Sequence, residues 1–336
     1  MNKKTLTLAA GLGALLAGCG GGGGGSGGGT AVPSGAVTLT SDNAQQAAGD
    51  AADANEGAVG GGGAGTTLFT GVVTQDSGGG TSVAELIRAQ VLRLDRLSGQ
   101  VALPLATGAV TTVNDTCSGG GSFSATWDDA DNDGEFSSGD SFTVTFSGCV
   151  EDGATLDGGM SLTGFTLTGD PSVVAPWSLG ADVGFDNLSI SEGGTSASID
   201  GDVSLTADTP DGVAISSRLS GSSLTLAIAG KSLTLSSFTF DYTEDLNTLA
   251  FSLSVSGTLQ STALNGSVTL STPTLFTGID INTFPTAGTL QIDGASNSRV
   301  SLTATGGDSV QLDIDNEGDG IIDDTQFTTW TALEAL

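Results

Sequence analysis

Alternation of apolar and polar residues is the feature that most limits how this chain can fold. It is clearest between Thr248 and Gln260, where Ser or Thr fills most of the even positions. The apolar odd positions are Leu249, Phe251, Leu253, Val255 and Leu259. Successive side chains of a β-strand point to opposite faces, so the pattern predicts strands with one buried and one solvated face. Comparable runs recur from Thr155 to Thr331.

Turn-forming dipeptides separate these runs. They are Gly193-Gly194, Asp211-Gly212, Gly230-Lys231, Asn265-Gly266 and Gly306-Gly307. Strands joined by such short turns pair with their neighbours along the chain, which predicts an all-β fold, an antiparallel meander of about ten strands. A slip in phase between Leu235 and Phe238 predicts a β-bulge at Ser236-Ser237. Because the apolar face must be covered, we expect a curled sheet, a barrel or a sandwich, or a sheet packed against a helix.

One N-terminal segment, Thr81 to Ser98, has the periodicity of an amphipathic helix. Ser82 and Glu85 have the spacing of a capping box. Its apolar residues recur at helical intervals: Val83, Leu86, Ile87, Val91, Leu94 and Leu97. Its three arginines, which lie mostly on other sides, are Arg88, Arg93 and Arg96. The helix could contact an anionic surface, but we favour packing on the sheet, with its arginines facing an acidic body.

The first 19 residues predict export and lipid attachment. Lys3 and Lys4 precede an apolar stretch that is too short to span a bilayer, which needs about 20 residues. The stretch ends in Leu16-Ala17-Gly18-Cys19, which resembles the lipobox of bacterial lipoproteins. The resemblance implies cleavage before Cys19, acylation of that cysteine and a stable membrane anchor. With Gly at position 20, it also implies the outer membrane, at its periplasmic face or at the cell surface.

The composition suggests four regions. Residues 1–18 form the expected signal peptide, and residues 19–66 carry the lipidated cysteine and a Gly-rich tether. The tether has almost no large apolar residue, so we expect it to be disordered. Residues 67–152 hold the predicted helix and an acidic hairpin. Residues 153–336 form the antiparallel β domain.

The charge balance and the absence of histidine exclude several functions. The chain has 8 basic and 38 acidic residues, no His and a formal net charge of −30. Such a charge disfavours nucleic acid as a partner and favours divalent cations. Without His the chain lacks the commonest acid–base group and metal ligand, which argues against zinc, haem and most nucleophile–base pairs. We therefore expect no enzymatic activity.

The segment from Asp129 to Asp140 carries the strongest chemical motif. Gly134 stands at the turn position of an EF-hand loop, and oxygen-bearing residues stand at its ligand positions. The candidate ligands are Asp129, Asp131, Asp133, the Glu135 carbonyl, Ser137 and Asp140. The loop resembles those of EF-hand and dockerin domains, and Asp at its last position is the dockerin-like choice. The flanking residues read as strands, so we carry over a calcium site but not the cohesin-binding function. A solvated acidic turn is the alternative.

The cysteines support this hairpin. Lipid on Cys19 leaves Cys117 and Cys149, and an exported chain meets an oxidising compartment, so the two are expected to form a disulfide. Both the cysteine pair and the acidic loop centre near residue 133. A hairpin with its tip there would place the cysteines opposite each other at its base.

A second, weaker calcium loop is expected near the C-terminus. Asp315 to Asp323 resembles the short acidic loops of thrombospondin type 3 repeats. Its candidate ligands are Asp315, Glu317, Asp319, the Ile321 carbonyl and Asp323. Asp313 and Asp324 are alternates in a shifted register.

Together these features predict a non-catalytic, calcium-binding envelope lipoprotein. We expect a structural, adhesive or partner-binding role, with the membrane, calcium and an unidentified protein, glycan or lipid as partners. The alternative is a carrier that holds a lipid or another hydrophobic ligand in an apolar β groove.

Overall fold

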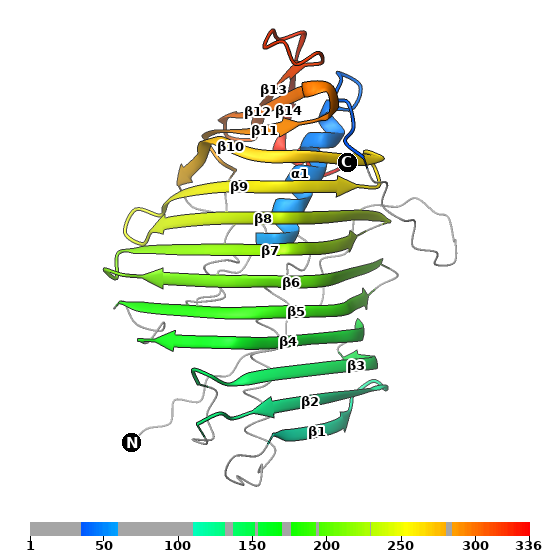
Figure 1. Cartoon of the computed structure of the whole chain (residues 1–336), viewed down its shortest axis with the longest axis vertical. Coiled ribbons are helices and arrows are strands. Elements are labelled where there is room, and N and C mark those ends of the chain that lie inside the picture. Colours follow the sequence, from blue (N-terminus) through cyan, green and yellow to red (C-terminus); the bar gives the residue numbers. More distant parts are fainter. Residues whose placement is uncertain are drawn as a thin grey trace.

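The fold is one long antiparallel sheet with a helix on one face. The structure is a computed structural model and describes residues 35–59, 110–131, 137–151, 154–169, 176–192, 195–228, 230–279 and 284–336. In these ranges each strand pairs with the next along the chain, from β1 to β14 (Figure 1). The strands are β1 (Thr111–Thr116), β2 (Ser122–Asp128), β3 (Ser141–Glu151), β4 (Ala154–Thr168), β5 (Trp177–Glu192), β6 (Thr195–Thr209), β7 (Ala214–Ile228), β8 (Lys231–Asp245), β9 (Ala250–Ser261), β10 (Gly266–Ile279), β11 (Ala287–Asp293), β12 (Arg299–Gly306), β13 (Ser309–Asp315) and β14 (Asp324–Thr329). The helical elements are α1 (Ala44–Val59), η1 (Ala295–Asn297) and α4 (Trp330–Leu333).

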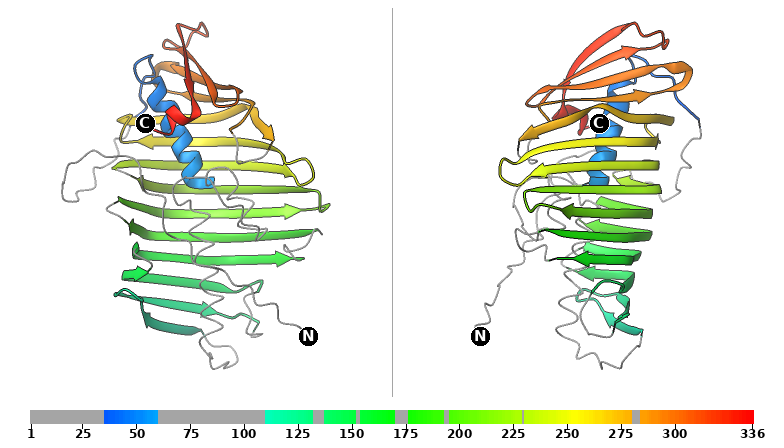
Figure 2. Two further views of the ribbon diagram at one scale, coloured as in Figure 1. Left: turned by 180° about the vertical axis from the view of Figure 1, so that it is seen from behind. Right: turned by 60° about the vertical axis from the view of Figure 1, so that its left-hand side comes forward.

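The predicted all-β antiparallel meander is confirmed, but its size and shape differ from the expectation. The sheet has 14 strands in the described ranges, not about ten. The edge strands β1 and β14 are polar and lack the apolar alternation on which the prediction depended. The sheet is open, with β1 and β14 as its two edges, and it bends over α1 only at its β11–β14 end (Figure 2).

Strand β8 shows how alternation and a bulge together keep one face apolar. Leu233 and Leu235 are buried before the predicted bulge, and Phe238 and Phe240 are buried after it. Ser237 has a φ of 47°, and the pairing with β9 shifts between Ser236 and Thr239. The extra residue restores the phase, so the predicted bulge at Ser236-Ser237 is confirmed and both halves of β8 face the core.

The start of β9 differs from the predicted strand. Leu249 was placed on the buried face, but it precedes the strand, has a φ of 58° and is 44% exposed. Its backbone belongs to the turn that Asp245 closes, where one carboxylate oxygen accepts hydrogen bonds from the N–H groups of Asn247 and Thr248, each at 2.9 Å. Turn chemistry therefore overrides the alternation at this end of the run.

Helix α1 lies within the segment that was expected to be a disordered tether, so that prediction was wrong for residues 44–59. Among residues 44–54 of α1, the buried residues are all small except Asp50: Ala44, Ala47, Ala48, Gly49, Asp50, Ala51 and Ala54. A stripe of alanines lets the helix lie close to the sheet, and tertiary packing rather than large side chains stabilises it. Its main contacts are with β7, β8, β9, β12, β13 and α4.

Polar contacts tie α1 to the ends of β8 and β9. Ser261 and Gln46 donate hydrogen bonds to the two oxygens of Asp50, the second at 2.8 Å. One turn further on, Asp53 forms a half-buried ion pair with Lys231, with 2.9 Å between carboxylate oxygen and Nζ. Asp50 is fully buried between helix and sheet. These hydrogen bonds offset part of the cost of removing its carboxyl group from water.

The residues before α1 are also fixed to the sheet. Ala36 forms an isolated parallel bridge with Ser267 of β10. The carbonyl of Val37 accepts a hydrogen bond from the N–H of Ala295 at 2.7 Å, and the N–H of Leu39 donates to Oγ of the buried Ser298 at 2.8 Å. The described residues before α1 thus contact β10 and the loop that carries η1.

Several predictions concern residues outside the described ranges, and one predicted domain boundary is crossed by the sheet. The signal peptide, Cys19, the amphipathic segment Thr81 to Ser98 and the Gly193-Gly194 turn lie outside the described residues. The expected boundary at residue 152 falls between β3 and β4, which pair with each other, so the sheet continues across it. No helix in the described part of the chain is long and apolar enough to cross a membrane.

The burial of Asp50 makes the stability of α1 packing depend on pH. Desolvation raises the pKa of Asp50, and it outweighs the opposing effects of Ser261, Gln46 and Lys231. A group whose pKa is raised on folding contributes stability that is present at low pH and is lost as the pH rises through the folded pKa. Asp50→Asn should therefore raise the melting temperature at pH 7 by about 2 °C or more and have little effect near pH 4.

Thermal unfolding of both proteins across pH 4 to 8 checks this expectation. Asp53→Asn is the matched control, because it removes a charge one turn away that is half-buried but paired with Lys231. An equal rise in melting temperature for both variants would mean that only the net charge matters.

Candidate functional site: an acidic hairpin loop

The β2–β3 hairpin places the acidic loop at one end of the sheet. Trp127 pairs with Phe142 and Asp128 pairs with Ser141, so the chain leaves the ladder at Asp129 and returns at Asp140. The pairing of Asp128 with Ser141 places Asp129 and Asp140 side by side at the ends of the two strands. Residues 132–136, which include the candidate ligands Asp133 and Glu135, lie outside the described residues.

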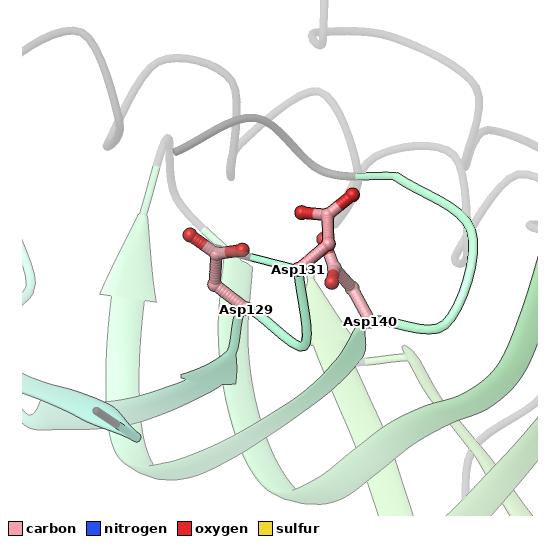
Figure 3. Close-up of side chains that lie close together, drawn as sticks. All are labelled: Asp129, Asp131 and Asp140. Carbon is pink, nitrogen blue, oxygen red and sulfur yellow. The ribbon is translucent and has the colours of Figure 1, made fainter. Parts of the chain in front are cut away.

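Three of the predicted ligands come together. Each of Asp129, Asp131 and Asp140 offers a carboxylate oxygen, and these oxygens lie within 4.8 Å of one another (Figure 3). A fourth predicted ligand, Ser137, donates a hydrogen bond from Oγ to Oδ2 of Asp131 at 3.1 Å. Asp140 is buried, Asp129 is half-buried and Asp131 is exposed, so the group opens toward solvent on one side. The described part of the loop therefore gathers oxygen donors around one point.

Asp140 also holds the loop in shape. Its two oxygens accept hydrogen bonds from the backbone N–H groups of Ala130 and Ser137, each at 2.8 Å. It thus joins the outgoing and returning ends of the loop. The sequence identified Asp140 only as a ligand and missed this structural role, which depends on how the two strand ends meet.

The returning end of the loop is anchored on β4. Gly139, with a φ of 101°, donates its N–H to the carbonyl of Phe165 at 2.8 Å. Ser138 Oγ accepts a hydrogen bond from the N–H of Leu167 at 2.7 Å and donates to the carbonyl of the same residue at 3.0 Å. Because β4 fixes this end, Ser137 and Asp140 are held in place by a third strand.

This donor set fits a hard cation. All the gathered ligands are carboxylate or hydroxyl oxygens, which is the ligand type that Ca²⁺ and Mg²⁺ take. Three like charges this close together repel one another, and a divalent cation between them would offset the repulsion. The arrangement suits a divalent cation of this kind and does not distinguish Ca²⁺ from Mg²⁺.

The second acidic loop, between β13 and β14, is organised differently. Asp315 is buried, and its carboxylate accepts hydrogen bonds from the N–H groups of Gly318 at 2.7 Å, Asp319 at 3.3 Å and Gly320 at 2.8 Å. Burial raises the pKa of Asp315, but these N–H groups together with that of Glu317 outweigh it, and the pKa lies below its usual value. The carboxylate is thus already stabilised by its own loop.

The other candidates of this loop do not gather around Asp315. Asp323 accepts a hydrogen bond from the N–H of Asn316, and Asp319 accepts one from the N–H of Ile321, each at 2.8 Å. Glu317 and Ile321 are exposed. The alternates Asp313 and Asp324 contact Thr325 and its neighbours. Among the described residues, the only group of three converging acids is the one formed by Asp129, Asp131 and Asp140.

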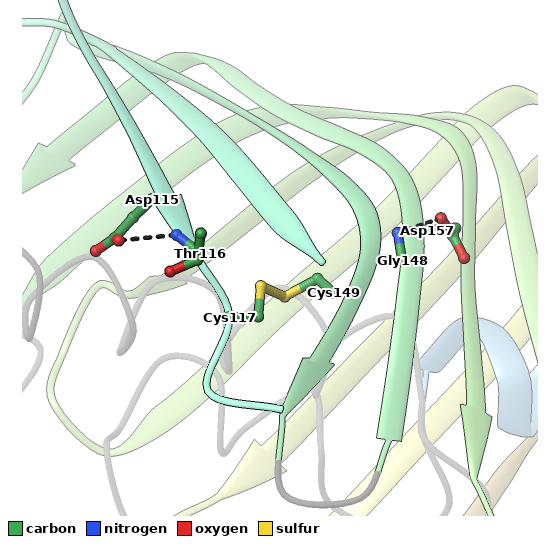
Figure 4. The surroundings of a disulfide bond; sticks show 6 residues. All are labelled: Asp115, Thr116, Cys117, Gly148, Cys149 and Asp157. Atoms are coloured by element: carbon green, nitrogen blue, oxygen red, sulfur yellow. Dashed lines mark hydrogen bonds between the residues drawn. A yellow bond between two sulfur atoms is a disulfide. The ribbon is translucent and has the colours of Figure 1, made fainter. Parts of the chain in front are cut away.

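The predicted disulfide between Cys117 and Cys149 is confirmed (Figure 4). Their Cα atoms are 5.3 Å apart and their positions are 32 residues apart in the chain. Cys117 directly follows β1, and Cys149 lies on β3, so the bond fixes the β1–β2 turn to β3. Backbone hydrogen bonds of 2.9 Å between Val150 and residues Gly119 and Gly120 support the same contact. The base of the hairpin is therefore covalently closed, at the end opposite the acidic loop.

Comparison of the chain with protein-family models, with curated proteins and with solved structures finds no match. The functional argument therefore depends on the chemistry of its own residues.

Removing Asp140 should separate its structural role from metal binding. In the presence of a chelator, Asp140→Ala leaves the N–H groups of Ala130 and Ser137 without their acceptor and should lower the free energy of unfolding by about 2 kcal/mol. Asp131→Ala, at the exposed side of the group, should change it by less than about 0.5 kcal/mol. Urea unfolding in EDTA measures both, and equal losses would contradict the role assigned to Asp140.

Proposed function

We propose that this chain is a non-catalytic envelope lipoprotein, held on the outer membrane by lipid on Cys19, that presents a calcium-stabilised β-sheet for adhesion, scaffolding or partner binding. The observation that carries this proposal is the wide polar face of the sheet. The acidic loop is the basis for proposing calcium, and the lipobox is the basis for proposing lipid on Cys19. The partner is an unidentified protein, glycan or lipid.

The outer face of the sheet carries pairs of hydroxyl groups on several strands, together with carboxylates such as those of Asp182 and Asp241. Facing threonines on neighbouring strands have their Oγ1 atoms 3.0 Å apart in Thr225–Thr234 and in Thr112–Thr126, and 3.2 Å apart in Thr289–Thr303. These pairs lie on β7–β8, β1–β2 and β11–β12, so hydroxyl pairs occur near both ends and in the middle of the sheet. A broad, rigid and hydrated surface of this kind suits recognition over an area rather than catalysis in a cleft.

A calcium ion would strengthen the end of this surface. The acids at the tip of the β2–β3 hairpin come from two strand ends and are braced by β4, so an ion bound there would link three neighbouring strands. Extracellular calcium modules of this type bind at about 10⁻⁴–10⁻³ M, which suits a permanently calcium-rich exterior rather than signalling. The benefit to the protein would be stability.

The composition supports a non-catalytic role. The chain contains no His. Among the described acids, Asp245 and Asp315 accept hydrogen bonds from backbone N–H groups, whereas Asp129, Asp131 and Asp140 form the candidate cation site. A sheet with few basic residues also suits neither a nucleic acid nor a phosphorylated substrate.

A carrier of a hydrophobic ligand is the second candidate. It is favoured by the inner face of β2–β6, which carries large apolar side chains that α1 does not cover. Native mass spectrometry of protein purified from its host decides between the two. A lipid present in near-stoichiometric amount would favour the carrier.

Calcium should stabilise the folded protein through the first loop. With a dissociation constant of about 10⁻⁴–10⁻³ M, 10 mM calcium should add about 1.4–2.7 kcal/mol by mass action. Combined Asp129→Asn and Asp131→Asn should abolish most of the rise in melting temperature. Asp319→Asn with Asp323→Asn is the matched control, and it measures any contribution of the second loop. A rise that survives the first pair of substitutions, or an equal effect of sodium chloride at the same ionic strength, would exclude the first loop as the site.

Lipid on Cys19 should place the protein in the membrane fraction. Cys19→Ser should remain as an uncut or soluble form because it lacks the acylated thiol, whereas the natural chain should partition into detergent. Labelled palmitate supplied to a Gram-negative host measures the modification directly. Failure of the natural chain to take up the label would refute the anchor and leave the β-sheet proposals untouched.

A further inference from the structure

The inner face of β2–β6 carries large apolar side chains that are buried, although no described helix lies over them. Cross-strand pairing brings large side chains together there, among them Val144 with Met160, Met160 with Phe185, and Leu162 with Val183. The same face continues into β7 through the pair of Leu205 and Leu219, and from there it runs under α1. Helix α1 ends over β7, and no described helix or strand lies over β2–β6 (Figures 1 and 2).

The course of the chain points to one occupant of this surface. Helix α1 ends at Val59 over β7, and the described chain resumes at Val110, next to β1. Residues 60–109 therefore connect two points that lie on opposite sides of β2–β6. Neighbouring strands are about 4.8 Å apart, so the distance from β7 to β1 is about 29 Å.

The sequence of this segment fits the surface in length and in pattern. Residues 81–98 have the periodicity of an amphipathic helix, which at about 1.5 Å per residue would be about 27 Å long. Its apolar stripe includes Leu86, Ile87 and Leu94. Helix α1, with 16 residues, crosses the other half of the sheet in a similar way.

Charge supports the same placement. Each of the strands β1–β6 carries at least one Asp or Glu, and none carries Lys or Arg. The segment 60–109 contains Arg88, Arg93 and Arg96, from a chain with only 8 basic residues. With the apolar stripe against the sheet, these arginines would lie within reach of an acidic body.

We propose that residues 60–109 cover the inner face of β2–β6, with 81–98 as an amphipathic helix that crosses these strands and continues the layer begun by α1. The surface is then the second half of the protein's own core, and no lipid groove remains there. This inference goes beyond the proposed function, because an adhesive or scaffolding role would stand with or without it.

Trypsin tests the proposal on the full chain, because the segment holds three of its few cleavage sites. Cleavage after Arg88, Arg93 and Arg96 should be at least tenfold slower in the folded protein than in the same protein unfolded in urea. Leu94→Asp places a charge in the apolar stripe and should remove this protection. Ala89→Asp, which adds the same charge on the opposite side of the helix, should retain it.

A second pair of variants tests the sheet side of the contact. Met160→Asp alters the inner face of β4 and should expose the three arginines, whereas Ser161→Asp on its outer face should not. Cleavage after Arg218, Lys231 and Arg299 reports on the sheet itself, and it should stay slow in Leu94→Asp even if Met160→Asp fails to fold.

Three results would overturn the proposal. One is rapid cleavage at the arginines in the natural chain, and another is protection that survives Leu94→Asp. The third is a stoichiometric lipid, or a dimer that dissociates in Met160→Asp, because either would identify a different occupant. Rapid cleavage, protection that survives Leu94→Asp, or a dimer would leave the proposed function untouched, whereas a stoichiometric lipid would count against both and favour the carrier. The calcium-dependent melting temperature tests the calcium site independently of all these outcomes.

Discussion

The need to cover one apolar face of a long open sheet governs the rest of this structure. An antiparallel meander satisfies its backbone hydrogen bonds strand by strand, but each strand leaves half of its side chains in need of a covering layer. At the β7–β13 end α1 supplies part of that layer, and the sheet bends over it (Figure 2). The polar face can contact solvent and needs no covering layer.

The covering helix differs from the usual amphipathic helix because its packing stripe consists of alanines. Small side chains bring the backbones close together: a Cβ added at Gly49 would lie 2.8 Å from the carbonyl oxygen of Leu333. Asp50 is fully buried on this helix, so its carboxylate depends on donors within the protein. Ser261 and Gln46 supply them, and Lys231 pairs with Asp53 nearby.

The excess of acid is accommodated mainly by backbone N–H groups. With 38 acidic and 8 basic residues, most carboxylates cannot find a cationic side chain. Asp140, Asp245 and Asp315 each accept two or more backbone N–H groups and thereby shape the loops that hold them. At the β2–β3 tip, however, three carboxylates converge, and this is where a divalent cation would add most.

The alternation in the sequence determined most of the strands, their order and the bulge in β8, because these features follow from a local period of two and from short turns. The edge strands β1 and β14 lack that pattern, and the disulfide was predicted from the pair Cys117 and Cys149 instead. The sequence also identified the acids at the tip of the β2–β3 hairpin, because adjacent strand ends bring them together. It did not reveal α1, since an alanine-rich stretch becomes a helix only when the sheet it packs against already exists. It equally did not distinguish Asp315, held by its own loop, from Asp131, held beside two other acids. Only the tertiary structure showed which carboxylates lie beside one another and which accept hydrogen bonds from backbone N–H groups, because both depend on the conformations of the loops.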